Sequence, residues 1–303
     1  MRGITKSSFV CDFCVNRTAF LISGASAVLA PRFAAASSLE GTIERAAAAS
    51  TGVVGVYARR MGPGDPISYD ADERFPSAST IKLVILTSLF QAAEREPGLL
   101  DRSLSVRAED FVGGSEVMDA YNPGDRVRLS TLARAMIEQS DNTASNALIT
   151  FLGFERINKT ARDAGMSRTQ LRHHFVDYTA VVQNRNTTTA HDMATLLYQI
   201  ERGAREGLPT VAMPQSCRAM IDILLRQEDR DKIARGLPHG VPVANKSGEV
   251  DGVRNDVAIV DPYGASPYVI AVLTKDLADF SEGNIAIRQI AKAVHRALYA
   301  GST

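Results

Sequence analysis

The chain has 303 residues, of which 45% are hydrophobic and 22% are charged, and this ordinary globular composition excludes a disordered chain. Its 34 basic and 34 acidic residues give a formal charge of zero, and no basic stripe is interleaved with aromatic residues. The sequence therefore predicts no nucleic-acid partner and leaves small, weakly charged substrates open.

The first 36 residues have the pattern of an export signal. Three basic residues precede an apolar stretch at 18–30, and small residues at 33–37 offer a cleavage site after Ala36. We expect a mature chain of residues 37–303, exported to the periplasm or the extracellular space and without a stable membrane span. The alternative is an uncleaved N-terminal anchor.

Cysteine and histidine usage argues against a metal site. Cys11 and Cys14 form a CxxC pair, but they lie inside the proposed signal and no second ligand pair follows. Only Cys217 remains in the mature chain, so no intramolecular disulfide is expected there. The five histidines show no metal-ligand spacing. We expect neither a metal nor another cofactor.

The mature chain opens with a helix and a hairpin. Residues 39–49 have an amphipathic helical pattern, and strands at 52–58 and 67–69 flank a glycine and proline turn at 61–66. Helical periodicity then dominates from 80 to 236. The predicted helices cover residues 81–94, 129–138, 144–152, 154–164, 189–203 and 215–225.

Strand patterns return near the C-terminus. The remaining predicted elements are strands at 241–246, 256–260 and 268–274 and a helix at 284–299. This order predicts one sheet built from both chain ends, with a helical lobe inserted between them. A cleft between the two lobes would be the natural place for chemistry.

Ser79 and Lys82 place a hydroxyl and an amine one helical turn apart, before an apolar run at 83–90. A serine hydroxyl attacks carbonyls only with a base nearby, and a lysine three residues later on a helix lies on the same face. That lysine can act as a base only if burial or a neighbouring cation lowers its pKa. A turn at 75–78 would put Ser79 at the helix N-terminus, where an oxyanion is stabilised. The alternative is a helix-capping serine followed by a surface lysine.

Two further tripeptides follow in the sequence. Ser140-Asp141-Asn142 supplies a second hydroxyl and a carboxamide between two predicted helices. Lys246-Ser247-Gly248, at the end of a predicted strand, supplies a cation, a hydroxyl and a glycine that lets a substrate approach closely. Taken singly, each could be an ordinary helix cap or strand end. All three motifs in this order are much rarer by chance.

With these motifs the sequence resembles the penicillin-recognising serine hydrolases, and most closely the class A β-lactamases. The resemblance spans essentially the whole mature chain and is carried by residues 75–82, 138–146, 187–189 and 246–260. It implies an α/β (α+β) fold of the β-lactamase/transpeptidase type. Such a fold has a five-stranded, mainly antiparallel sheet with flanking helices and an inserted all-helical lobe. We expect a single catalytic domain, with one lobe from 37–75 and 237–303 and a helical lobe from 76–236.

The resemblance also implies catalytic roles. Ser79 would be the acylated nucleophile and Lys82 its activating base or proton shuttle. Ser140 would relay a proton to the leaving nitrogen. The backbone N–H groups of Ser79 and Glu249 would form the oxyanion hole.

Substrate-binding roles follow from the same resemblance. Asn142 would hydrogen-bond the side-chain amide of the substrate, while Lys246 and Ser247 would bind its carboxylate. Arg254 would add a second positive group near that carboxylate, or would form a surface salt bridge instead. Tyr121 would form the aromatic wall at the mouth of the cleft.

The loop at 171–186 departs from the family, whose loop glutamate holds the water that releases the acyl group. This loop contains no glutamate. The arginine and aspartate that pair across the family's loop neck are His173 and Asn186 here, so we expect the loop to close differently. Asp177 is the candidate replacement base, with His173 and His174 as weaker candidates, and a purely structural role is the alternative.

The sequence therefore predicts a serine hydrolase that opens β-lactam amides through a Ser79 acyl-enzyme, with the deacylation route left open. One alternative is a D-alanyl-D-alanine carboxypeptidase or esterase-like hydrolase. Another is a non-turnover protein that binds β-lactams or cell-wall peptide. In each case the partner is a small molecule, and we expect a monomer.

Overall fold

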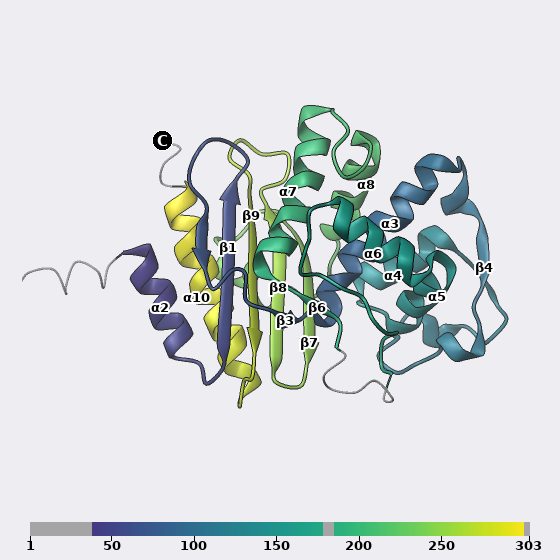
Figure 1. Ribbon diagram of the computed structural model, residues 1–303, viewed down its shortest axis with the longest axis horizontal. Coiled ribbons are helices and arrows are strands. Elements are labelled where there is room, and N and C mark those ends of the chain that lie inside the picture. The colour runs from purple at the N-terminus through teal and green to yellow at the C-terminus, as the bar shows by residue number, and fades with distance from the viewer. Residues whose placement is uncertain (1–37, 178–184, 300–303) are drawn as a thin grey trace, which may run out of the picture.

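The computed structural model describes residues 38–177 and 185–299 (Figure 1). The predicted export signal, with Cys11 and Cys14, lies outside the described residues. Within the two described ranges, no helix has the length and apolar character needed to cross a membrane.

A five-stranded sheet forms the centre of the structure, with the strand order β2-β1-β9-β8-β7 and every neighbouring pair antiparallel. As predicted, its strands come from both chain ends. They are β1 (Val53–Arg60), β2 (Ile67–Tyr69), β7 (Val243–Val250), β8 (Val253–Val260) and β9 (Tyr268–Lys275).

Strand β7 is longer than the sequence predicted. Its ladder with β8 continues until Val250 pairs with Val253, so the Lys246-Ser247-Gly248 segment lies inside the strand. The expectation that this segment ends the strand was wrong. Serine and glycine are weak strand formers, so the apolar pattern stopped before the hydrogen-bonded ladder did.

The sheet has a separate apolar core on each face. Along β9, Ile270 and Val272 join one buried cluster, whereas Ala271 and Leu273 join the other, as the alternation of side chains along a strand requires. Both faces are therefore covered by helices, as Figure 1 shows. The face that carries Ile270 and Val272 packs against α2 (Leu39–Ala48), α9 (Ile233–Gly236) and α10 (Phe280–Tyr299).

The face that carries Ala271 and Leu273 packs against α7 (Ala190–Glu206) and α8 (Pro214–Leu224). The other helices of the helical lobe lie beyond these two. Helix α3 is buried on nearly every side, because other helices surround it. The helices are α3 (Lys82–Arg95), α4 (Leu129–Glu138), α5 (Asn142–Leu152), α6 (Phe154–Asp163), α7 (Ala190–Glu206) and α8 (Pro214–Leu224). Each lies within a few residues of its predicted position.

Short elements that the sequence did not predict complete the lobe. Two small antiparallel pairs join β3 (Phe75–Pro76) to β6 (Thr187–Thr188) and β4 (Ser103–Ser105) to β5 (Arg126–Arg128). The turn η1 (Ala78–Ile81) leads directly into α3 and lies against β7 and β8. The edge strand of the sheet therefore meets the helical lobe at this turn.

Candidate active site

Ser79 lies in the 3₁₀ turn η1, and α3 begins at Lys82. Residues three apart eclipse each other in a 3₁₀ turn, so the two residues share a face. Ala78 has a φ of 44°, a left-handed conformation that is costly for a residue with a Cβ atom. Strain of this kind, next to an accessible hydroxyl, is characteristic of active-site turns.

The Lys82 side chain is completely buried and surrounded by oxygen atoms. Its Nζ lies 2.6 Å from the Ser140 carbonyl oxygen, 2.9 Å from Asn142 Oδ1 and 3.2 Å from Ser140 Oγ. Burial, followed by the nearby Lys246 cation, holds the pKa of Lys82 well below its ordinary value. Lys82 thus meets the condition for a lysine base. No hydrogen bond of the described residues joins Lys82 to the Ser79 hydroxyl, and such bonds often tighten only when substrate is bound.

Ser140 lies between α4 and α5 with a φ of 59°. Its hydroxyl is 3.1 Å from Lys246 Nζ as well as 3.2 Å from Lys82 Nζ, so it links the two lysines. The next residue, Asp141, caps α5 by accepting a 2.8 Å hydrogen bond from Ala144 N. The capping explanation for this tripeptide is therefore correct for Asp141 and leaves Ser140 free to face the lysines.

Lys246 projects from β7 into the same buried region. Its Nζ also donates to the Ser247 carbonyl oxygen at 2.8 Å. Burial lowers the pKa of Lys246 to about 7, and nearby Asp256 and Asp229 oppose that shift. Lys246 can therefore gain or lose its charge near neutral pH, and a bound anion would favour the charged form.

Gly248 brings β7 against the nucleophile turn. A Cβ atom at this position would lie 2.9 Å from Ser79 N and 3.0 Å from Thr80 N, closer than Cβ atoms normally approach a backbone. Glycine is thus required here so that the strand and the turn can touch. This contact brings the backbone of Glu249, the next residue, near the turn.

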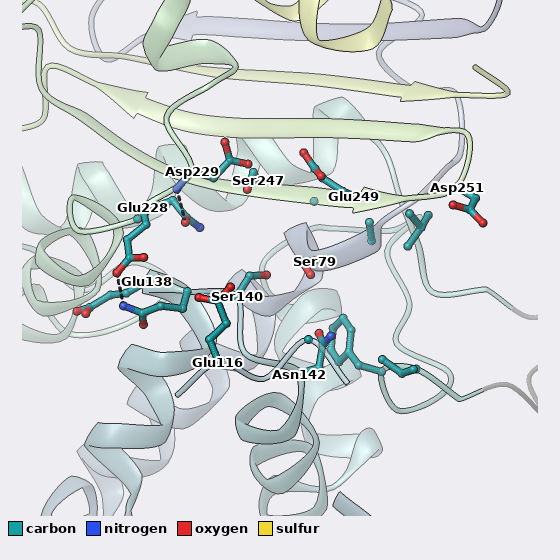
Figure 2. Close-up of a pocket in the computed structure, with 18 residues that line it drawn as sticks. Ser79, Glu116, Glu138, Ser140, Asn142, Glu228, Asp229, Ser247, Glu249 and Asp251 are labelled. Carbon is teal, nitrogen blue, oxygen red and sulfur yellow. Dashed lines mark hydrogen bonds between the residues drawn. The ribbon is translucent and has the colours of Figure 1, made fainter. Parts of the chain in front are cut away.

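Ser79, Ser140 and Gly248 line a cleft of about 700 Å³ between the sheet edge and the helical lobe, and the two lysines are buried behind them. In Figure 2, Ser79 lies between the edge strand, which carries Ser247 and Glu249, and the helical lobe, which carries Ser140 and Asn142. Each of the three distant sequence motifs therefore contributes at least one residue to the lining of one cavity. Within the described part of the chain, no group of His, Cys, Asp and Glu side chains could hold a metal ion.

Two predicted binding residues lie elsewhere. Arg254 is not part of the cleft lining, since its guanidinium packs 4.1 Å from the centre of the Phe280 ring and 3.8 Å from the Glu249 carboxylate. Arg254 therefore forms a salt bridge, the alternative to carboxylate binding that the sequence left open. Tyr121 packs against the helical core and is not among the residues that line the cleft. The structure therefore shows no aromatic wall from Tyr121.

The loop from Leu171 closes differently from the family's ion pair, as expected, and the structure shows that the side-chain amide of Asn186 holds its neck. Asn186 Oδ1 accepts hydrogen bonds from the backbone N–H groups of Arg172 at 2.7 Å and His173 at 3.2 Å. Its Nδ2 donates to the His173 carbonyl oxygen at 3.2 Å. The neck is therefore held by an asparagine bonded to backbone rather than by an ion pair. Residues 178–184 of the loop lie outside the described residues.

The candidate bases of this loop do not line the cleft, which receives Phe175 and Val176 instead. Asp177 is partly buried and interacts electrostatically with His174. Burial lowers the pKa of His174, whose Nε2 is 3.3 Å from Thr150 Oγ1. The Phe175 ring centre lies 4.4 Å from Lys82 Nζ, a contact for which the sequence gave no signal beyond its place in the loop.

A second unpredicted feature is the buried Lys232 beneath β7. Its Nζ lies 2.5 Å from both Asp229 Oδ2 and Glu249 Oε1. Burial lowers the pKa of Lys232, but the hydrogen bonds to these two carboxylates outweigh it and raise the pKa overall. The contact ties Glu249, the predicted oxyanion residue, to the segment that follows α8. No motif marked Lys232 in the sequence.

A nucleophile turn, two buried lysines and a bridging serine at the junction of a sheet and a helical lobe define a serine hydrolase of the β-lactamase/transpeptidase-like fold. Residues 38–298 match the family described as the beta-lactamase enzyme family. The chain belongs to this family, as a class A serine β-lactamase that acts on β-lactams.

Relatives cover most of the chain. Beta-lactamase L2 of Stenotrophomonas maltophilia is 30% identical over 252 residues, which is 81% of each protein. The crystal structure of a β-lactamase from Sphaerobacter thermophilus has a TM-score of 0.78 and 29% identity, and covers 88% of this chain and 98% of its own. PBP-A has a TM-score of 0.78 and 28% identity, and covers 86% and 96%. One PBP-A structure is a leucine-to-glutamate variant in an acyl-enzyme complex with penicillin G.

Proposed function

We propose that this β-lactamase opens the lactam amide by forming an acyl-enzyme on Ser79. The observation that carries the proposal is the Ser140 hydroxyl, which lies 3.2 Å from Lys82 Nζ and 3.1 Å from Lys246 Nζ beside the nucleophile turn. At these distances Ser140 can exchange a proton with Lys82, and it would then pass that proton to the substrate nitrogen. The acyl-enzyme complex of PBP-A with penicillin G supports the same intermediate here.

Acylation would begin with Lys82. Because burial favours its neutral form, its amine accepts the Ser79 proton as Oγ bonds to the lactam carbonyl carbon. The carbonyl oxygen becomes an oxyanion, which the backbone N–H groups of Ser79 and Glu249 stabilise. The C–N bond then breaks, and the nitrogen takes a proton from Ser140, which is replenished by the protonated Lys82.

Substrate recognition would use the remaining groups of the cleft. Asn142 Nδ2 donates one hydrogen to the Gly113 carbonyl oxygen at 3.0 Å, which leaves its second hydrogen for a side-chain amide of the substrate. Lys246 and Ser247 would bind the substrate carboxylate. We assign Arg254 to the support of Glu249, which it approaches from outside the cleft.

The cellular context is also a proposal. We place the enzyme outside the cytoplasm, as a monomer produced by removal of residues 1–36, with residues 37–303 as one catalytic domain. The basic and apolar pattern of that segment supports export.

The test combines a chromogenic cephalosporin assay with intact-mass spectrometry. The expected result is turnover together with an adduct of the substrate's mass on the enzyme, and Ser79→Ala should abolish both. Thr87→Ala, which removes a buried hydroxyl on α3 outside the cleft lining, is the matched control and should retain the adduct. Turnover that persists in Ser79→Ala would overturn the assignment.

A further inference from the structure

Strand β7, which carries Glu249, lies at the edge of the sheet. Strand β8 pairs with it on one side, and no strand of the described residues pairs with it on the other. An edge strand leaves backbone groups unpaired and is held by neighbours on one side only. A backbone N–H group of this strand that must stay aligned with Ser79 N therefore needs a second support.

The 229–232 segment, which follows α8, supplies that support along the first half of β7. Arg230 Nη1 donates to the Val243 carbonyl oxygen at 2.8 Å and to Asn245 Oδ1 at 2.9 Å. Asn245 Nδ2 in turn donates to the Asp229 carbonyl oxygen at 3.2 Å. The segment thus bonds two alternate residues of the strand.

The next two alternate residues of β7, Ser247 and Glu249, meet side chains of the same segment. Lys232 Nζ lies 2.5 Å from both Asp229 Oδ2 and Glu249 Oε1. Burial alone would raise the pKa of Asp229, but the hydrogen bond and charge of Lys232, together with a hydrogen bond from Ser247, outweigh it and lower the pKa. Because side chains alternate along a strand, all four contacts fall on one side of β7.

The contact with Lys232 is the last of these and the closest to the nucleophile turn. The Lys232 side chain is only 1% exposed, so water screens its attraction to the two carboxylates weakly. Arg254, at 3.8 Å from Glu249 Oε1, is a more distant partner. In Figure 2, Glu249 projects from the strand away from Ser79, whereas Gly248 touches the nucleophile turn. The strand is therefore held on both of its faces at this point.

We propose that Lys232 is a positioning residue for the oxyanion hole: through Glu249 it fixes the edge strand so that Glu249 N stays aligned with Ser79 N. The inference rests on the proposed Ser79 acyl-enzyme and concerns the tetrahedral transition state that leads to it. Lys232 is not among the residues that line the cleft. Its removal should therefore weaken the transition state more than the first binding of substrate.

The experiment measures these two quantities separately in the full chain. Stopped-flow mixing with a chromogenic cephalosporin over a range of concentrations gives the acylation rate constant and the dissociation constant of the first complex. Phenylboronic acid reports the oxyanion hole directly. Its boron atom bonds to Ser79 Oγ as the serine proton passes to Lys82, and the tetrahedral anion places a boron-bound oxygen in the hole.

Lys232→Met keeps an unbranched side chain and removes the charge. Acylation should slow, and the Kd of phenylboronic acid should rise, by roughly tenfold each, since a misaligned donor costs less than the loss of about 10²–10³-fold for a missing one. The dissociation constant of the first complex should change less than about threefold. Lys292→Met, at an exposed position of α10 outside the cleft lining, is the control and should match the wild type.

Glu249→Ala is the second variant, and it tests the contact even if Lys232→Met does not fold. It leaves Lys232 paired with Asp229 and should show the same two losses, by roughly three- to tenfold. Glu206→Ala is its control, because Glu206 is 41% exposed against 46% for Glu249 and also pairs with an arginine. If Lys232 acts through Glu249, the double variant should lose no more than Lys232→Met alone.

A purely structural role for Lys232 would give a different result. It would lower the Tm and the burst amplitude, which counts active molecules, but would leave the acylation rate constant and the boronic acid affinity of those molecules unchanged. Parallel losses in these two quantities, with the first complex preserved, support the positioning role.

The outcomes also separate this inference from the proposed function. If the wild-type enzyme turns over substrate with no adduct on Ser79 by intact mass, the acyl-enzyme itself is wrong. If the adduct forms but folded Glu249→Ala keeps the wild-type acylation rate and boronic acid affinity, the positioning role is wrong. The role is also wrong if the losses of the single variants add in the double variant, or if the first complex weakens as much as acylation slows.

Discussion

The nucleophile region and the loop from Leu171 to Asn186 face the same cleft but are built very differently. Beside Ser79, the Ser140 hydroxyl lies within 3.2 Å of both Lys82 Nζ at the start of α3 and Lys246 Nζ on β7. From the loop, Phe175 and Val176 enter the cleft instead of a carboxylate. The two half-reactions of an acyl-enzyme therefore depend on separate parts of the fold, and one can be retained while the other changes.

The largest expected effect is on the acylation side. Lys82→Met keeps an unbranched side chain but removes the base, so the acylation rate should fall by about 10²–10⁴-fold. Single-turnover burst kinetics would measure it. Lys159→Met, on the exposed face of α6, is the control and should acylate normally. An unchanged burst in Lys82→Met would mean that another group activates Ser79.

The contact between β7 and the nucleophile turn offers a steric test. Gly248→Ala would place a Cβ atom 2.9 Å from Ser79 N, so the strand or turn must shift. The strain should cost about 1–3 kcal/mol, and acylation should slow by roughly 5–150-fold. Gly62→Ala, where a Cβ atom meets nothing within 4 Å, should have no effect on the burst rate. Equal burst rates in the two variants would show that this close contact is not needed.

The neck of the loop should matter for stability. Asn186→Ala removes the hydrogen bonds to Arg172 N, His173 N and His173 O, and should lower the free energy of unfolding by about 1–3 kcal/mol. Urea denaturation would measure the change. Asn284→Ala is the matched control, because Asn284 Oδ1 has no hydrogen-bond partner among the described residues. A larger loss in the control would contradict the assigned role of Asn186.

The pH dependence should report Lys246. Its pKa of about 7 means that the side chain is charged below neutrality and loses its charge as the pH rises through 7. For a substrate with a carboxylate, kcat/KM should therefore decline above that pH, by up to about tenfold per unit. Lys246→Arg stays charged over this range and should flatten the decline. A decline that persists in Lys246→Arg would point to a different group.

The smallest effect is expected at Asp177, the base that the sequence favoured. Because Phe175 and Val176 line the cleft and Asp177 does not, Asp177→Asn should change the acyl-enzyme lifetime less than about threefold. Decay of the adduct by intact mass would measure it. A lifetime prolonged tenfold or more would restore Asp177 as the water base.

Much of the fold was predictable because its signals are local. Apolar periodicity located the strands and helices within a few residues, and their order gave a sheet from both chain ends. The three motifs identified Ser79, Ser140 and Lys246 because their residue types carry specific chemistry. The strand β7 was underestimated, since its last residues are ordered by hydrogen bonds to β8 rather than by apolar side chains.

What the tertiary structure decided is the environment of each group. The low pKa of Lys82 comes from burial and from Lys246, which is 164 positions away in the numbering of the chain. Arg254 and Phe175 show the same dependence, since one is turned out of the cleft by Phe280 and the other is clamped into it by Asn146. A sequence specifies which groups are present, but pKa and orientation depend on neighbours that only folding brings together.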